Sequence, residues 1–254
     1  MKVFGKAALL QDFIPPIAYK LMRCIGINVD TGKEDEPYVA PFLHSYSQYH
    51  EDLIVQSIFR SLENGFYVDV GANHPSILSN TKMFYDRGWH GINIEPNPLL
   101  LESFSKERPR DINLNIGISD ECGEMDFYRM SADTLSTFSK KSAIDSQGTY
   151  KEKIVDVIRV NVKPLSSVLE EYCSSKAIDF MSIDVEGYDL IVLKSNNWDL
   201  FRPKILVIEI NQDEGDIVRF IESVGYEIAY KNHTNALFVD NCFVKEMSAI
   251  GVAR

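Results

Sequence analysis

Two acidic residues, each beside or at the end of a short apolar run, predict a site for a nucleoside-type ligand. The run over 66–70 contains Asp69 and leads into Gly71, and the run over 91–94 ends in Glu95. Glycine has no Cβ atom, so its backbone can approach a ligand closely. A carboxylate at a strand tip can accept hydrogen bonds from both hydroxyls of a ribose. We therefore expect these residues to bind a cofactor, although turn chemistry alone also favours aspartate and glycine.

The glycine segment lacks the motifs that bind a diphosphate. Ala72, Asn73, His74 and Pro75 follow Gly71, so the dinucleotide fingerprint GxGxxG is absent, and the sequence contains no GxxxxGK[ST] phosphate loop. An adenosyl cofactor without phosphates fits this segment better, which favours S-adenosylmethionine.

Three further acids are candidates for catalysis. Asp184 ends the apolar run over 178–184, Glu186 follows it, and Glu209 interrupts an otherwise apolar run. Carboxylates are rarely buried among apolar residues without a proton, a cation or hydrogen-bond donors. We expect Asp184, supported by Glu186 and Glu209, to act as a general base or to hold Mg²⁺ in an all-oxygen site. The structural alternative is a helix start at Glu186 and an ion pair at Glu209. His233, in a loop before the last predicted strand, is a minor candidate for the base.

Strands and helices that alternate along the chain must hold these residues. Strands are predicted at 66–70, 91–94, 112–118, 125–129, 155–162, 178–184, 205–210, 226–230 and 236–239. Helices are predicted at 49–62, 81–87, 98–108, 164–172, 190–193 and 213–224, with Asn80 and Asn97 as N-caps. Such alternation is typical of a mostly parallel, doubly wound α/β sheet, with its ligand at the carboxyl ends of the strands. The polar segment 131–153 shows no periodicity and is expected to be a mobile lid or substrate loop.

Length and charge limit the classes of protein. The chain has 254 residues, which suits one α/β domain at 44–254 after an N-terminal extension and linker at 1–43. The net charge of −11, from 26 basic and 37 acidic residues, argues against a nucleic-acid partner. The four cysteines are far apart and indicate neither a disulfide framework nor a zinc site. These features favour a cytoplasmic protein.

The segment 1–27 has its own composition. It mixes apolar and basic residues around Pro15 and Pro16, and no apolar run reaches the roughly 18 residues that span a bilayer. One interpretation is a weak peripheral contact with an anionic membrane. The other is packing on the domain, or on a second subunit in a homo-oligomer.

Residues 44–240 resemble the FkbM-type methyltransferases. The matching motifs are Tyr46-Ser47-Gln48 with Glu51-Asp52, Val68-Asp69-Val70-Gly71-Ala72-Asn73, Ser79-Asn80-Thr81, Gly91-Ile92-Asn93-Ile94-Glu95-Pro96, Ile183-Asp184-Val185-Glu186-Gly187 and Thr234-Asn235. The resemblance implies a class I methyltransferase fold, which is a Rossmann-like, doubly wound, mostly parallel seven-stranded sheet, here with an N-terminal helical extension. It also implies methyl transfer from S-adenosylmethionine to a hydroxyl, often on a sugar of a glycan or glycoconjugate.

The resemblance extends the set of expected cofactor-binding residues. That set is Gln48, Asp52, Asp69, Gly71, Ala72, Asn73, Glu95, Pro96, Ser119 and Asp184. Gln48 and Asp52 are expected to contact the methionine end of the cofactor, and the alternative is that they only cap a helix. Ser119 is expected to contact the adenine edge, and the alternative is that it lies in a surface turn. Two alternatives to a sugar methyltransferase stay open. One is methylation of a lipid or small-molecule acceptor, and the other is a non-catalytic scaffold that binds the cofactor.

Overall fold

The computed structural model describes residues 44–173 and 177–252. The extension predicted over 1–43, with its helical character and its membrane or subunit contact at 1–27, lies outside these residues.

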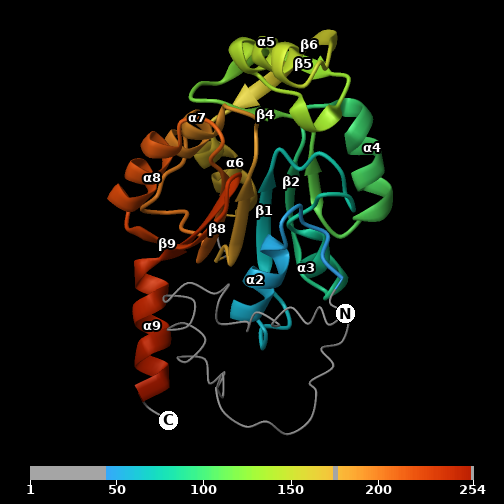
Figure 1. Ribbon diagram of the computed structural model, residues 1–254. Helices are drawn as coiled ribbons and strands as arrows, with labels where there is room; N and C mark the ends of the chain where they lie inside the picture. The colour runs from blue at the N-terminus through green and yellow to red at the C-terminus, as the bar shows by residue number, and fades with distance from the viewer. Residues whose placement is uncertain (1–43, 174–176, 253–254) are drawn as a thin grey trace, which may run out of the picture.

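A seven-stranded sheet forms the centre of the molecule (Figure 1). Its strands are β1 (Phe66–Val70), β2 (His90–Ile94), β3 (Ile112–Leu114), β7 (Phe180–Ile183), β8 (Ile205–Glu209), β9 (Tyr226–Lys231) and β10 (Asn235–Asp240). The strand order is β3-β2-β1-β7-β8-β10-β9, and β10 alone runs antiparallel to its neighbours. The predicted mostly parallel, doubly wound sheet is therefore confirmed. The order reverses between β1 and β7, which places the expected ligand crevice at their carboxyl ends.

Apolar side chains cover both faces of this sheet. Helices α6 (Leu165–Cys173), α7 (Asp189–Lys194) and α8 (Glu214–Ser223) pack on the face that carries Val68 and Val70. Helices α2 (Glu51–Ile58), α3 (Lys82–Asp86) and α9 (Asn241–Val252) pack on the opposite face, which carries Tyr67. Because successive side chains of a strand point to opposite faces, the buried run of β1 serves both cores.

One row of polar residues interrupts the second face. Asp69, Asn93 and Asn113 lie side by side across β1, β2 and β3. Asp69 and Asn93 are buried. Polar groups in such a position need hydrogen-bond partners. Thr81 Oγ1 donates to Asp69, and the Asn93 amide donates to Asp111 and Asn113.

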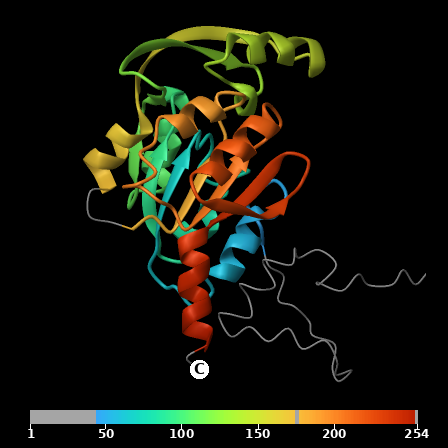
Figure 2. The same ribbon diagram turned by 90° about the vertical axis from the view of Figure 1, so that its left-hand side faces the viewer.

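A second, three-stranded sheet lies beyond the carboxyl end of the first (Figure 2). It consists of β4 (Gly117–Ile118), β6 (Ile154–Lys163) and β5 (Gly123–Met130), in that order, with β5 antiparallel to β6. The single strand predicted over 112–118 is therefore wrong, because the chain leaves the main sheet after Leu114. The Asn115 side-chain amide donates to the carbonyls of Glu95 (2.8 Å) and Pro96 (3.0 Å), which fixes this departure.

The segment 131–153 also differs from the irregular loop that we expected. It contains a short 3₁₀ turn, η2 (Asp133–Leu135), and helix α5 (Lys140–Thr149). Ser139 caps α5, since its Oγ accepts from the Ser142 N–H at 3.1 Å. Both elements lie near the second sheet in Figures 1 and 2.

One of the two predicted helix caps differs in the structure. Asn80 does not cap α3; Thr81 occupies that position without a side-chain cap, and the Asn80 amide donates to Ser182 Oγ instead (3.0 Å). Asn97 does cap α4 (Pro98–Glu107), as predicted, by accepting from the Leu99 N–H. Within the described parts of the chain, no helix has the length and apolar character to cross a bilayer.

Candidate active site

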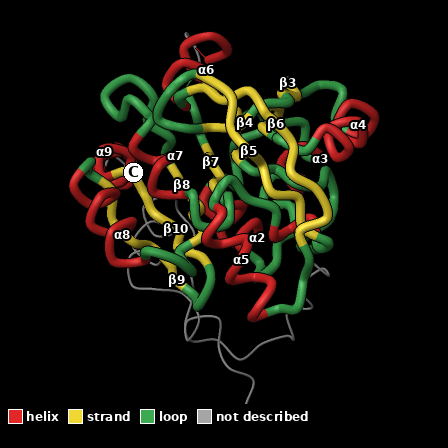
Figure 3. The backbone as a smooth tube through the Cα atoms, turned by 90° about the horizontal axis from the view of Figure 1, so that it is seen from above, coloured by secondary structure: helices red, strands yellow, loops and turns green. Residues whose placement is uncertain are grey.

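A cavity of about 470 Å³ opens where β1, β2, β7 and β8 end. The second sheet and the segment 131–153 lie over the same end of the main sheet, which Figure 3 views from above. Phe127, Phe138 and Tyr150 from that upper layer line the cavity. Its size is typical of sites for small molecules.

Contacts within the protein itself require glycine at position 71. Its φ is +77°, and a Cβ atom there would lie 1.9 Å from the carbonyl oxygen of Asp184. The Gly71 and Ala72 N–H groups donate to the Ile94 carbonyl. Glycine therefore permits close contact between the end of β1 and the chain after β7, and so brings Asp184 to the cavity.

The Glu95 carboxylate lies at the tip of β2 and lines the cavity. One oxygen accepts from the Asn97 N–H (2.7 Å) and the other from the Asn73 N–H (2.8 Å). Burial raises the pKa of Glu95 from 4.5 to about 8, while these two N–H groups oppose the shift. Each carboxylate oxygen keeps a further acceptor site, as binding of a ribose diol requires.

Three carboxyl groups meet at the other side of the cavity. Asp184, Glu186 and Glu209 each offer one oxygen, and these oxygens lie within 4.8 Å of one another. Glu209 is 5 % exposed and accepts from the Asn211 side-chain amide at 2.6 Å. Thus the acids that interrupt or follow separate apolar runs do come together, as the sequence predicted.

Burial and mutual repulsion raise the pKa of all three groups. Burial is the largest cause of the shift for each group. The charge of Asp69 further raises the pKa of Asp184, and the charge of Asp184 further raises the pKa of Glu186 and of Glu209. A hydrogen bond between the carboxyl groups of Asp184 and Glu209 partly offsets the rise in the pKa of Asp184. The cluster therefore retains protons near neutral pH unless a cation neutralises it.

A pair of rings borders the same end of the cavity. His233 Nε2 lies 3.0 Å from the Tyr49 hydroxyl, and both residues line the cavity. The Glu51 carboxylate accepts from the Tyr49 N–H (3.0 Å) and from the side-chain amide of Asn235 (2.8 Å). Glu51 thereby joins the segment before α2 to the start of β10, next to Glu209.

Most predicted site residues share this cavity. Its lining includes Gln48, Asp69, Gly71, Ala72, Asn73, Glu95, Pro96, Asp184, Glu186, Glu209 and His233. Asp52 and Ser119 do not line it. The Asp52 carboxylate accepts from Ser45 Oγ (2.6 Å) and the Tyr46 N–H (2.7 Å), and Ser119 Oγ lies 3.3 Å from the Tyr188 hydroxyl.

Sequence reasoning missed the apolar part of the lining. Leu78 is 52 % exposed and Tyr150 is 60 % exposed, yet both border the cavity. Phe127 and Phe138 lie deeper and are buried. Nothing in their spacing distinguishes such residues from ordinary core or surface positions, because their role depends on how the second sheet folds over the first.

The sequence profile of the family described as methyltransferase FkbM domain matches residues 69–228. A search of curated proteins returned no match. Similar solved structures include a TehB-like SAM-dependent methyltransferase from Corynebacterium glutamicum, with 11% identity and a TM-score of 0.41, covering 75% of this chain and 86% of that one. A precorrin-6y C5,15-methyltransferase from Geobacter metallireducens has 10% identity and a TM-score of 0.39, with 77% and 90% covered.

Proposed function

We propose, from the premise that this chain belongs to the FkbM methyltransferase family, that it is an O-methyltransferase that uses S-adenosylmethionine and a sugar hydroxyl as acceptor. The observation that carries this proposal is that one cavity is lined both by Glu95 and by the acids Asp184, Glu186 and Glu209, which we call the Asp184 cluster. One end suits a ribose, and the other end holds groups that can take a proton. The two ends belong to adjacent parts of the same sheet edge, as a direct transfer reaction requires.

The residues present fit the cofactor. S-Adenosylmethionine, when bound, supplies a methyl group on a positively charged sulfur. Glu95 would hold the ribose hydroxyls, and Gln48 lies on the cavity wall where it can contact the methionine end. The lining includes the acids Asp69, Glu95, Asp133, Asp184, Glu186 and Glu209 but, among the described residues, no lysine or arginine. This charge pattern favours a cationic ligand over a phosphorylated one.

The Asp184 cluster would deprotonate the acceptor. Asp184 would accept the hydroxyl proton as the methyl carbon exchanges its bond to sulfur for a bond to the hydroxyl oxygen, which leaves the cofactor sulfur uncharged. The hydrogen bond with Glu209 lowers the pKa of Asp184 and so helps to keep it ionised before the transfer. The raised pKa of Asp184 makes it a better base than an exposed aspartate when it is ionised. His233 would serve this role if Asp184 does not.

The cavity lining also supports a sugar hydroxyl as the acceptor. A neutral sugar hydroxyl avoids repulsion from the acids, whereas a nucleotide sugar would bring its phosphates among them. The exposed Leu78 and Tyr150 at the border can contact an apolar sugar face or an attached apolar group. These two residues also keep a lipid-linked acceptor open as the second candidate.

The central test is the variant Asp184→Asn. The substitution keeps size and removes the base, so binding of S-adenosylmethionine measured by calorimetry should survive while turnover falls by about 10²-fold or more. Turnover is measured as transfer of labelled methyl to a panel of neutral oligosaccharides and glycolipids. The control is Asp120→Asn, which alters an exposed acid outside the cavity lining. Normal turnover of Asp184→Asn would remove this residue from the mechanism and favour His233.

A metal at the same acids is a separate branch of this test. Three carboxylate oxygens within 4.8 Å fit the oxygen preference of Mg²⁺. If Mg²⁺ binds there, it should raise the melting temperature of the wild type more than that of Glu209→Gln, and EDTA should abolish turnover. Equal melting shifts and EDTA-resistant turnover would leave only the metal-free base.

A further inference from the structure

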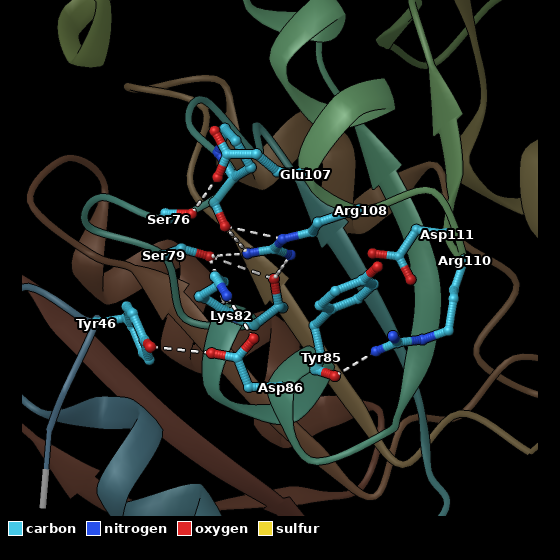
Figure 4. Close-up of polar contacts among 12 residues, drawn as sticks. Tyr46, Ser76, Ser79, Lys82, Tyr85, Asp86, Glu107, Arg108, Arg110 and Asp111 are labelled. Carbon is cyan, nitrogen blue, oxygen red and sulfur yellow. Dashed lines mark hydrogen bonds and ion pairs between the residues drawn. The ribbon is translucent and has the colours of Figure 1, made fainter.

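Arg108 is a completely buried arginine whose hydrogen bonds all go to neutral oxygens. It directly follows α4 and has 0 % exposure. Its guanidinium donates to the Pro75 carbonyl from Nε (2.8 Å) and also from Nη2, and to Ser79 Oγ (2.7 Å). It also donates to Thr81 Oγ1 (2.7 Å) and, more weakly, to Asn93 Oδ1 (3.4 Å). Figure 4 shows the guanidinium among these contacts. Its five N–H groups are thus all used.

Four of these five bonds hold the segment that follows the glycine loop. The inner side of that segment contributes Ala72, Asn73, Leu78, Ser79 and Asn80 to the cavity. One end of the segment reaches Glu95, because the Asn73 N–H donates to its carboxylate. The other end reaches the strand before Asp184, because the Asn80 amide donates to Ser182. The segment 72–81 is therefore the wall that joins the ribose end to the catalytic end.

The backbone of this wall needs an external anchor. Asn73 and Leu78 have φ values of 52° and 53°, in the left-handed region. Asparagine tolerates this conformation, but leucine rarely adopts it, and it persists only where the surroundings fix it. Arg108 donates to Pro75, which lies between these two positions in the sequence, and to Ser79, which directly follows Leu78. Thus Arg108 fixes the strained part of the wall.

The anchor also connects the wall to the sheet. Thr81 Oγ1 accepts from Arg108 and donates to Asp69 Oδ2 at 2.6 Å. Asp69 and Asn93 are direct neighbours on β1 and β2. Neither Arg108 nor Thr81 lines the cavity, so these two residues can act on a ligand only through the wall or through Asp69, which lines the cavity.

We infer that Arg108 is a positioning residue for the cofactor: its guanidinium holds the wall 72–81 in the shape that binds S-adenosylmethionine. This inference rests on the proposed function. A lysine cannot replace it, because one ammonium group has three donors and cannot span Pro75, Ser79 and Thr81 with the fixed fork of a guanidinium.

Arg110 offers a matched control. It lies two residues further along the same segment, is exposed, and stacks on the Tyr85 ring at 3.8 Å from the ring centre. It donates to the Tyr85 carbonyl and not to the wall (Figure 4). Arg108→Lys and Arg110→Lys therefore make the same chemical change at neighbouring sites with different contacts.

The experiment measures the Kd of S-adenosylmethionine by calorimetry for the wild type and both variants, at a temperature where circular dichroism shows each to be folded. Hydrogen exchange of residues 72–81 is followed in parallel. We expect Arg108→Lys to raise Kd by about tenfold or more, the scale of one lost charge-assisted hydrogen bond. Exchange of the wall should become faster, and Arg110→Lys should leave both quantities unchanged.

The outcomes separate three possibilities. If Arg108→Lys lowers only the melting temperature and its Kd stays within twofold of the wild type, the inference is overturned and Arg108 is purely structural. If the wild type itself does not bind S-adenosylmethionine, the proposed function fails. If Arg108→Lys does not fold, Thr81→Val decides, since it removes one bridging hydroxyl and nearly preserves shape. Because Thr81 also donates to Asp69, the Kd is read together with exchange of the wall. A weaker Kd with faster exchange of residues 72–81 supports the inference, whereas an unchanged Kd, or a weaker Kd without faster exchange, overturns it.

Discussion

Glu95 combines two requirements that oppose each other. The side chain must be buried to form the end of the cavity, yet a buried carboxylate is costly, and its pKa is accordingly raised to about 8. The N–H groups of Asn73 and Asn97 reduce this cost without removing it. A ligand whose hydroxyls donate to Glu95 would reduce it further, so cofactor binding and ionisation of Glu95 should be coupled.

This coupling predicts the pH dependence of stability. The folded pKa of Glu95 lies above its ordinary value of 4.5, so the folded state keeps a proton that the unfolded state releases between these values. Stability of the ligand-free protein should therefore fall as pH rises from about 5 to about 8. In Glu95→Gln this fall should be smaller because the amide does not ionise, although its one oxygen replaces the two that accept from the N–H groups. Melting curves at both pH values check this. An identical fall in wild type and variant would contradict it.

The acids of the site could be predicted from sequence, but Arg108 could not. Asp184 and Glu209 are conspicuous because they occur within or at the end of apolar runs. Arg108 lies in the run Glu107–Asp111, whose charged residues look like a solvated helix end. Its burial depends on Pro75 and Ser79, which are far away in the sequence and reach it only when the glycine loop folds back.

At the scale of elements, helix α5 buries few of its side chains. Among its residues only Ser142 and Ala143 are buried, so the helix has little apolar contact with the rest. The polar contacts of this region include those of Ser142 Oγ with Gln212 Oε1 (3.1 Å) and of Thr137 Oγ1 with the Glu186 carbonyl (2.9 Å). The second contact links the segment 131–153 directly to the acid cluster.

The small buried area of α5 predicts that the segment 131–153 opens and closes over the acceptor. Its amide hydrogens should exchange fast in the ligand-free protein, because small buried area gives low local stability. Exchange should slow when S-adenosylmethionine and an acceptor are both bound. Hydrogen exchange with mass spectrometry measures this, with the buried strand β7 as the protected reference. Strong protection of 131–153 without ligand would refute a lid.

Periodicity predicted most elements but not the sheet to which each belongs. In 112–118, apolar residues alternate with Asn113, Asn115 and Gly117 as in one strand. The structure divides this stretch between two sheets, at the point where Asn115 donates to the carbonyls of Glu95 and Pro96. Likewise, β6 reads as another strand of the series, whereas its partners are β4 and β5. Pairing depends on contacts between distant segments, which a local pattern does not contain.

At the scale of the whole molecule, charge distinguishes the substrate from its product. The chain carries a net charge of −11, and acids line the cavity. S-Adenosylmethionine has a net positive charge, because its sulfonium and ammonium groups outweigh its carboxylate. Loss of the methyl group leaves S-adenosylhomocysteine with no net charge. The field of the protein should therefore attract the substrate and act little on the product.

Salt should reveal this difference. Raising the NaCl concentration from about 50 mM to about 500 mM shortens the range of electrostatic attraction to a few ångströms. We expect the affinity for S-adenosylmethionine to fall several-fold over this range, while that for S-adenosylhomocysteine changes less than about twofold. Calorimetry with both ligands at both salt concentrations provides the comparison, and the neutral product serves as the internal control for any effect of salt on the fold. If both affinities respond equally, the acids of the cavity are neutralised by protons or by a bound cation, and the charge of the sulfonium plays no part in selecting substrate over product.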